Sequence, residues 1–162
     1  MVIDRGYLAD PDGLEFLPSA PEALRWLHER GHRLVVVTNQ SGVGRGLFSI
    51  GRVEAMNVRL CEMVERVGAR LSGIYFCPHA PEANCLCRKP NLALMAQAAS
   101  DLTFDPRKAF VVGDKESDIE FGKRAGAKTI LLAPGTPVHG SAATLTVPTL
   151  LQAATFITSQ PR

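Results

Sequence analysis

Short runs of apolar, mostly β-branched residues alternate along the chain with longer segments in which apolar residues recur every three or four positions. The short runs predict buried strands and the recurring pattern predicts amphipathic helices. Strands are expected at residues 34–38, 73–77, 109–114, 129–133 and 144–147. The alternation predicts an α/β fold of the Rossmann-like kind, a parallel sheet with helices on both faces. Ligands of such sheets bind at the carboxyl ends of the strands.

The predicted helices have recognisable ends. The first is expected to begin at the capping-box pattern Ser19-Ala20-Pro21-Glu22 and to stop at Gly31. Further helices are expected at residues 91–102, at residues 118–126 and near residues 149–157. Another helix precedes the second strand and carries an apolar face, formed by Val53, Met56, Leu60, Val64 and Val67. Cys61 falls in this helix and is expected to act as a small apolar residue.

Composition narrows the classes of protein to consider. The chain has 162 residues, of which 46% are apolar and 21% charged, so residues 1–162 are expected to form a single domain. A formal net charge of +2 is too small to indicate nucleic-acid or membrane binding. No apolar run is long enough to span a bilayer, and the N-terminus has no basic start followed by an apolar stretch, so the cytoplasm is the expected location. A monomer is also expected.

One segment, "CPHAPEANCLCRKP" at residues 77–90, is dense in soft metal ligands. Three thiolates and one imidazole form a common tetrahedral zinc site, and Cys77, His79, Cys85 and Cys87 offer that set. A closed site leaves no position for substrate, so zinc here would brace the loop. The alternative is a redox cysteine pair, but Cys85-Leu86-Cys87 lacks the two-residue spacer of thioredoxin-like motifs.

Polar residues follow several predicted strands. Thr38 begins the segment "TNQSGVGRG", whose hydroxyl, amide and glycine-rich backbone could cradle a phosphoryl oxygen, although polar turns follow many buried strands. Asp114 and Asp118 follow the strand "AFVVGD" and are suited to holding Mg²⁺, although Asp118 could instead cap the next helix. Lys89 could neutralise phosphate charge beside Asp114.

The order of these motifs along the chain points to a protein family more specifically than any single motif does. "TNQSG", the loop ending in "CRKP", and "VGD" followed by Asp118 together resemble the haloacid dehalogenase (HAD) superfamily of phosphatases. Within it the chain is similar to the heptose 1,7-bisphosphate phosphatases, with zinc-bearing histidinol-phosphate phosphatases as relatives. The resemblance extends from Asp4 to the C-terminal helix and includes Asp4-Arg5-Gly6-Tyr7, which matches an Asp-x-Gly-Tyr segment that contacts substrate.

The resemblance implies a Mg²⁺-dependent phosphatase that acts on a phosphorylated sugar and carries structural Zn²⁺. Thr38 would hold the transferring phosphoryl group and Lys89 would stabilise its developing charge. Asp114 would ligate Mg²⁺, with Asp118 close to that ion. The residues implied in substrate binding are Asp4, Arg5, Gly6, Tyr7, Thr38, Asn39, Gln40, Ser41, Arg88, Lys89 and Lys115.

The resemblance also implies a strand ending in Asp-x-Asp-Gly, whose first aspartate attacks phosphorus and whose second transfers protons. In the resembled family this motif precedes the Asp-x-Gly-Tyr segment, so the nucleophile would fall before Met1. The missing strand would lie at the sheet centre, between residues 34–38 and 109–114. We therefore predict that residues 1–162 alone are inactive. A late start or a truncated first segment is expected, rather than a natural pseudoenzyme.

Asp10-Pro11-Asp12-Gly13 has the letters of that motif but no preceding apolar strand, and it predicts a solvated turn. Histidinol-phosphate hydrolysis on the same scaffold remains an alternative. So does a non-catalytic, zinc-stabilised module that binds phosphorylated sugars.

Overall fold

The computed structural model describes residues 1–3, 6, 10–135 and 141–161. The segment that contains Asp4, Arg5 and Tyr7 therefore lies mostly outside the described residues. The strands are β1 (Leu34–Asn39), β2 (Leu71–Cys77), β3 (Phe110–Gly113), β4 (Lys128–Leu132) and β5 (Leu145–Val147). The helices are α1 (Ala20–Glu29), α2 (Ser41–Gly44), α3 (Ile50–Arg66), α4 (Ala93–Leu102), α5 (Glu116–Arg124) and α6 (Leu150–Ser159). Short 3-10 turns lie at Pro11–Gly13, Pro81–Ala83 and Pro106–Lys108.

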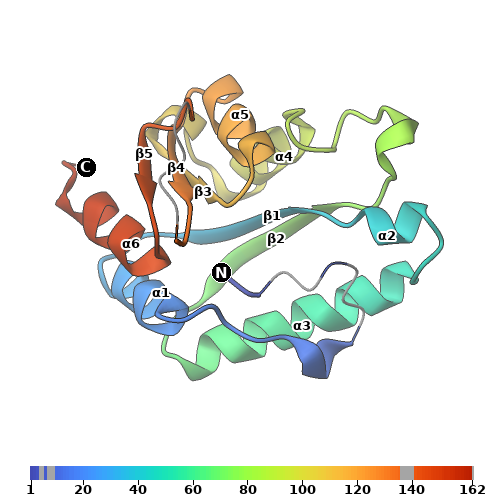
Figure 1. Cartoon of the computed structure of the whole chain (residues 1–162), viewed down its shortest axis with the longest axis horizontal. Coiled ribbons are helices and arrows are strands. Elements are labelled where there is room, and N and C mark those ends of the chain that lie inside the picture. Colours follow the sequence, from blue (N-terminus) through green and yellow to red (C-terminus); the bar gives the residue numbers. More distant parts are fainter. Residues whose placement is uncertain (4–5, 7–9, 136–140, 162) are drawn as a thin grey trace.

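The strands form two parallel sheets, which Figure 1 shows as separate groups. One sheet pairs β1 with β2, in a register that runs from Val35 opposite Gly73 to Asn39 opposite Cys77. The other has the order β3-β4-β5, again with parallel neighbours. The predicted α/β class and the places of the strands are confirmed. The described part of the chain provides no strand that joins β1 to β3.

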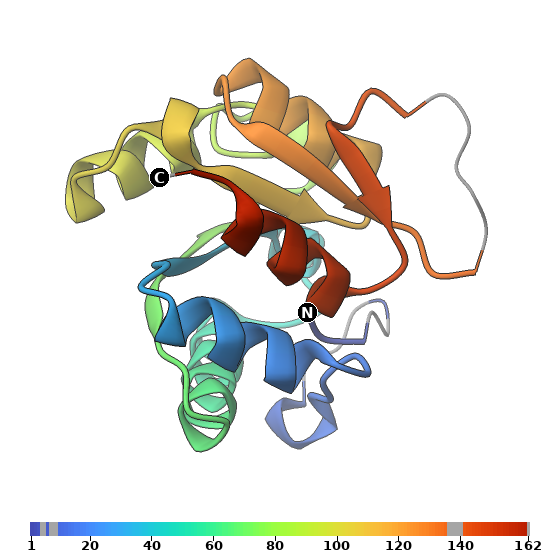
Figure 2. The same cartoon turned by 90° about the vertical axis from the view of Figure 1, so that its left-hand side faces the viewer.

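Helices pack on both sheets. Helix α3 contacts β2 on one side and α4 contacts it as well, while α5 covers β3 and β4. Helices α1 and α6 lie side by side, as Figure 2 shows. Their apolar faces meet β4 in a buried cluster formed by Ala23, Leu27, Ile130, Leu132, Ala153, Ala154 and Ile157. A second cluster contains Leu24, Leu60, Val64 and Ala69. No helix in the described ranges is both long and apolar enough to cross a bilayer.

Two details at helix ends bear on the predictions. The capping-box prediction for α1 is wrong: Ser19 has a left-handed backbone (φ 63°) and its hydroxyl makes no capping hydrogen bond. Left-handed geometry at the N-cap differs from the extended backbone that lets a serine side chain reach the first turn. Asp10, by contrast, lies in a turn as expected, where its Oδ1 accepts a hydrogen bond from the Asp12 N–H at 3.1 Å.

Candidate active site and metal centre

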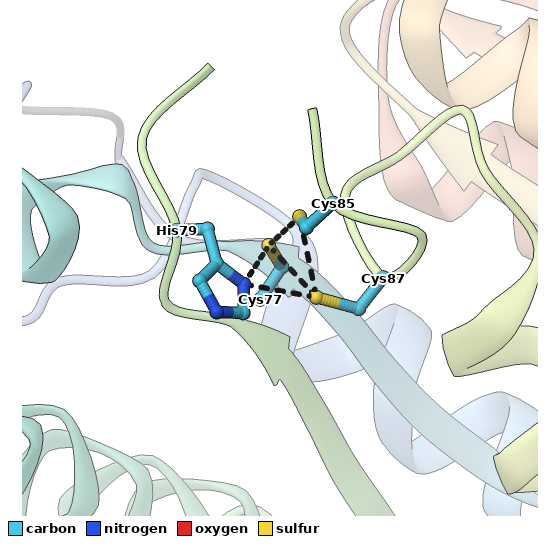
Figure 3. Close-up of side chains that lie close together, drawn as sticks. All are labelled: Cys77, His79, Cys85 and Cys87. Carbon is cyan, nitrogen blue, oxygen red and sulfur yellow. Dashed lines mark hydrogen bonds between the residues drawn. The ribbon is translucent and has the colours of Figure 1, made fainter. Parts of the chain in front are cut away.

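The carboxyl end of β2 leads into a cluster of three thiols and an imidazole. In Figure 3 the side chains of Cys77, His79, Cys85 and Cys87 point toward one another. The sulfur atoms of Cys77 and Cys87 are 3.2 Å apart, and each lies 3.4 Å from the Cys85 sulfur. His79 Nδ1 lies 3.2 Å from the Cys87 sulfur and 3.6 Å from that of Cys77. The four ligand atoms therefore enclose one point.

This arrangement fits a tetrahedral zinc ion. Zinc–sulfur bonds of about 2.3 Å place two sulfur ligands about 3.8 Å apart, close to the separations seen here. A disulfide requires about 2.05 Å between sulfurs, which none of these pairs approaches. Cys77 is fully buried, Cys85 and Cys87 are half-buried and His79 is exposed, so zinc would tie a surface loop to a buried strand end. Cys61 lies elsewhere, on α3.

In the absence of metal, the thiols of Cys77 and Cys85 have very different pKa values. Burial, followed by hydrogen bonding with Cys87, raises the pKa of Cys77 to about 12. Partial burial also opposes ionisation of Cys85, but hydrogen bonds from the Cys77 and Cys87 thiols outweigh it and lower its pKa to about 7. A positive ion at the centre of the cluster would stabilise all three thiolates together.

The loop that follows β1 packs closely against the metal loop. The Gln40 N–H donates to the Cys77 carbonyl at 2.7 Å and the Gly44 N–H donates to the Pro78 carbonyl at 2.8 Å. A Cβ atom at Gly44 would lie 2.3 Å from the Ala80 nitrogen, so glycine is needed for this approach. The far end of the metal loop is held by Asn91, whose side-chain amide donates to the Cys85 carbonyl at 2.9 Å.

Lys89 lies two residues beyond the last cysteine and reaches between the two sheets. Its Nζ donates to the Val37 carbonyl of β1 at 2.6 Å and lies 2.8 Å from Asp118 Oδ1 on α5. Asn39 fixes the Lys89 backbone from both sides: its Nδ2 donates to the Lys89 carbonyl and its Oδ1 accepts from the Lys89 N–H. Lys89 therefore sits where the carboxyl ends of β1 and β3 converge, with its side chain only 14% exposed.

Thr38 lies at the same end of β1, where its hydroxyl oxygen accepts a hydrogen bond from Gln40 Nε2 at 3.3 Å. The hydroxyl proton is then available to a ligand oxygen. Ser41 begins α2 beside it. Arg88 is turned toward the metal loop, where its Nη1 lies 3.5 Å from the His79 carbonyl oxygen. The predicted residues of the "TNQS" and "CRK" segments thus gather at one edge.

The two aspartates after β3 differ in environment. Asp114 and Lys115 are exposed, whereas Asp118 is buried. Besides its contact with Lys89, Asp118 accepts the Lys115 N–H through Oδ2 at 3.2 Å, which caps the first turn of α5. Asp118 therefore already has partners, and Asp114 offers an exposed carboxylate for a divalent ion. One carboxylate, with water and a ligand phosphate, suffices for many Mg²⁺ sites.

Two features of this site were missed from the sequence: the clamp of Asn39 on Lys89, and the ion pair between Lys89 and Asp118. Asn39 was expected to line the substrate, yet its amide is bonded to the Lys89 backbone. These contacts join residues far apart along the chain, and no local spacing marks them.

Comparison with known proteins agrees with this architecture. Residues 86–153 match the family model described as HAD-hydrolase-like. The chain is 40% identical over 137 residues to a D-glycero-beta-D-manno-heptose-1,7-bisphosphate 7-phosphatase of Helicobacter pylori, a match that covers 84% of this chain and 79% of the relative. The corresponding Haemophilus ducreyi protein is 39% identical, over 80% of this chain and 75% of its own length.

Solved structures give the same result. A D,D-heptose 1,7-bisphosphate phosphatase from B. bronchiseptica, complexed with magnesium and phosphate, superposes with a TM-score of 0.81 at 26% identity, covering 92% of this chain and 87% of that one. The enzyme from Burkholderia thailandensis gives a TM-score of 0.68 at 29% identity, over 94% of this chain and 92% of its own. The chain therefore belongs to the HAD-like hydrolases, in the group that contains the heptose bisphosphate phosphatases.

Proposed function

We propose that this protein is a phosphomonoesterase of sugar metabolism that removes a phosphate from D-glycero-D-manno-heptose 1,7-bisphosphate and leaves the 1-phosphate. The observation that carries the proposal is the position of Lys89. It is a partly buried cation at the carboxyl ends of β1 and β3, held by Asn39 and Asp118 directly behind the metal loop. The names of the matched relatives supply the substrate.

Each residue at this edge has a proposed task. The Thr38 hydroxyl would donate to an oxygen of the phosphoryl group, since Gln40 already donates to its own oxygen. The Lys89 ammonium would stabilise negative charge that develops on that group. Arg88 and Lys115 would bind the substrate's other charged or polar groups. Zn²⁺ on Cys77, His79, Cys85 and Cys87 would fix the loop that presents Arg88 and Lys89.

Asp114 would ligate Mg²⁺, which when bound helps to neutralise the phosphate charge. Its exposure at the end of β3 leaves it open to water and to ligand oxygens. Asp118 would contribute indirectly, because its carboxylate orients Lys89.

We propose further that residues 1–162 bind this substrate without hydrolysing it. The aspartyl-phosphate chemistry implied by the family requires an aspartate at the end of a strand. Residues 10–13 match the Asp-x-Asp-Gly pattern but form a surface turn, in which the Asp10 carboxylate accepts a hydrogen bond from the Asp12 N–H. Within the described residues, no strand joins β1 to β3 and brings an attacking carboxylate to this edge.

Calorimetric titration of residues 1–162 with the heptose bisphosphate tests the site. Binding is expected, and Lys89→Ala should weaken it at least tenfold, whereas Lys108→Ala, an exposed lysine before β3, should leave it unchanged. Equal affinity of the Lys89→Ala chain would contradict the proposed site. Mg²⁺-dependent phosphate release by residues 1–162 at about 1 s⁻¹ or faster, a rate typical of enzymes, would contradict the proposed inactivity.

A further inference from the structure

We propose that Asn91 is a positioning residue of the metal loop, residues 77–91. It closes the turn formed by residues 85–91 and so keeps the thiols of Cys85 and Cys87 in a fixed relation to Lys89. Its effect on zinc follows from contacts within the loop alone. Its effect on substrate rests on the proposed function, because that function assigns Lys89 to phosphate recognition.

Asn91 holds the turn at two points. Its side-chain Nδ2 donates to the Cys85 carbonyl at 2.9 Å, and its backbone N–H donates to the Arg88 carbonyl at 2.8 Å. These two bonds bring the end of the turn back to its beginning. Asn91 also lies just before helix α4, which begins at Ala93 and packs on β2. The residue therefore ties the metal loop to the sheet-and-helix body of the protein.

The sulfur of Cys85 is held by the same turn. The backbone N–H groups of Cys87 and Arg88 both donate to this sulfur. Arg88 is thus fixed at its N–H by the Cys85 sulfur and at its carbonyl by the Asn91 N–H. Donors to a thiolate orient it and stabilise its negative charge. Loosening the turn would displace these donors and the Cys85 sulfur together.

Lys89 lies on the same turn, and the zinc ligands do not fix its direction by themselves. It comes two residues after Cys87, and rotation of the intervening backbone could turn its side chain away from the site. Asn39 of β1 holds the Lys89 N–H and carbonyl at 3.0 and 3.2 Å. Asn91 holds the carbonyl of the preceding residue. Two asparagines from different elements therefore fix the backbone that carries the cation.

The chemistry of the side chain explains why an amide is suited to this position. Aspartate has nearly the same shape, but its carboxylate has no donor and would repel the Cys85 carbonyl oxygen. Replacing the groups that support metal ligands typically lowers metal affinity by about 10- to 100-fold. We therefore expect Asn91→Asp to weaken zinc binding by a factor in this range. Asn91→Leu, which removes the donor without adding charge, should do the same.

Asn84 offers a matched control within the same loop. Its Nδ2 donates to the carbonyl of Glu82, which is not a zinc ligand, at 3.3 Å, and its side chain is exposed. Asn84→Asp removes the same donor and adds the same charge close to the metal. Competition with a chromophoric zinc chelator measures the affinities of residues 1–162 and of the variants. Asn91→Asp should bind zinc about 10- to 100-fold more weakly than Asn84→Asp.

Hydrogen exchange of the zinc-loaded proteins separates positioning from a general loss of stability. In Asn91→Asp the amides of Cys87, Arg88 and Lys89 should exchange at least about tenfold faster, while those of the buried strand β4 keep their rates. Equal acceleration in both regions would show general destabilisation and would overturn the proposal. Equal zinc affinities of the Asn91→Asp and Asn84→Asp chains would overturn it as well.

Calorimetric titration of the zinc-loaded protein with the heptose bisphosphate tests the effect on Lys89. The neutral Asn91→Leu variant is suited to this measurement, because an added carboxylate would itself repel the phosphates. It should bind the sugar at least about tenfold more weakly than the unaltered chain. Unchanged binding would overturn the link between Asn91 and Lys89. If the unaltered chain does not bind the sugar, the proposed function fails, and the zinc affinities alone decide the role of Asn91.

Discussion

At the residue scale, Lys89 links the parts of the site. A partly buried ammonium paired with one carboxylate and one carbonyl is stable only while its partners remain, because an unpaired charge here loses hydration without compensation. The same contacts aim the cation at the edge where a phosphate would bind. Stability and substrate recognition are therefore coupled at this position.

Replacing Lys89 by methionine should lower the free energy of unfolding by about 3 kcal/mol, since it leaves the Asp118 carboxylate buried and without its cation. Adding Asp118→Asn to that variant should restore part of the loss. Denaturant titration of the two single variants and the double variant measures the coupling. Glu29→Gln, which breaks the exposed Arg25–Glu29 pair, is the control and should change stability by less than about 1 kcal/mol. A similarly small effect of Lys89→Met would contradict the buried ion pair.

The cluster thiols should react in a fixed order in metal-free protein. At pH 7 about half of Cys85 is thiolate, because its pKa is about 7, whereas Cys77 with a pKa of about 12 remains protonated. Only the thiolate is nucleophilic, so iodoacetamide should modify Cys85 at least about a hundredfold faster than Cys77. Peptide mass mapping over time measures the two rates, and equal rates would count against the hydrogen bonds assigned to Cys85.

At the element scale, the short helix α2 packs tightly against the metal loop and helps to hold that loop in place. Gly44→Ala should destabilise the protein by about 1 to 3 kcal/mol, since the added Cβ meets the backbone of Ala80 and His79. Gly51→Ala is the matched control: its Cβ meets nothing closer than 3.8 Å, and alanine in helix α3 should stabilise by about 0.5 to 1 kcal/mol. Thermal unfolding of the two variants should therefore shift in opposite directions, and a neutral Gly44→Ala would contradict the packing.

Removal of zinc should loosen the loop and the contacts that depend on it. Chelation is expected to speed hydrogen exchange in residues 77–91 and to weaken binding of the heptose bisphosphate, because Lys89 lies only two residues after Cys87. Metal analysis should find about one zinc per chain, lost in Cys87→Ser and retained in Cys61→Ser, whose thiol lies on α3. Retention of full zinc by Cys87→Ser would contradict the ligand set.

Patterns that are local in sequence predicted local features well. Apolar β-branched runs marked each strand, and the spacing of three cysteines and one histidine marked the metal cluster. The four-residue helix α2 was not predicted, since it is too short to show helical periodicity. The Lys89–Asp118 pair was not predicted either, because it is created by the convergence of two strand ends.

At the scale of the whole molecule, the site lies at one end of a cavity that separates two parallel sheets. Lys89 bridges that end, and the apolar edges of β1 and β3 form the walls. The position of the cavity and the position of the proposed chemistry therefore coincide.

The most direct measurement assays phosphate release from the heptose bisphosphate by the protein expressed from its full open reading frame. We predict Mg²⁺-dependent turnover at about 1 s⁻¹ or faster, lost in Lys89→Ala. A protein that binds the sugar without hydrolysing it would contradict the phosphatase and favour a phosphosugar-binding protein.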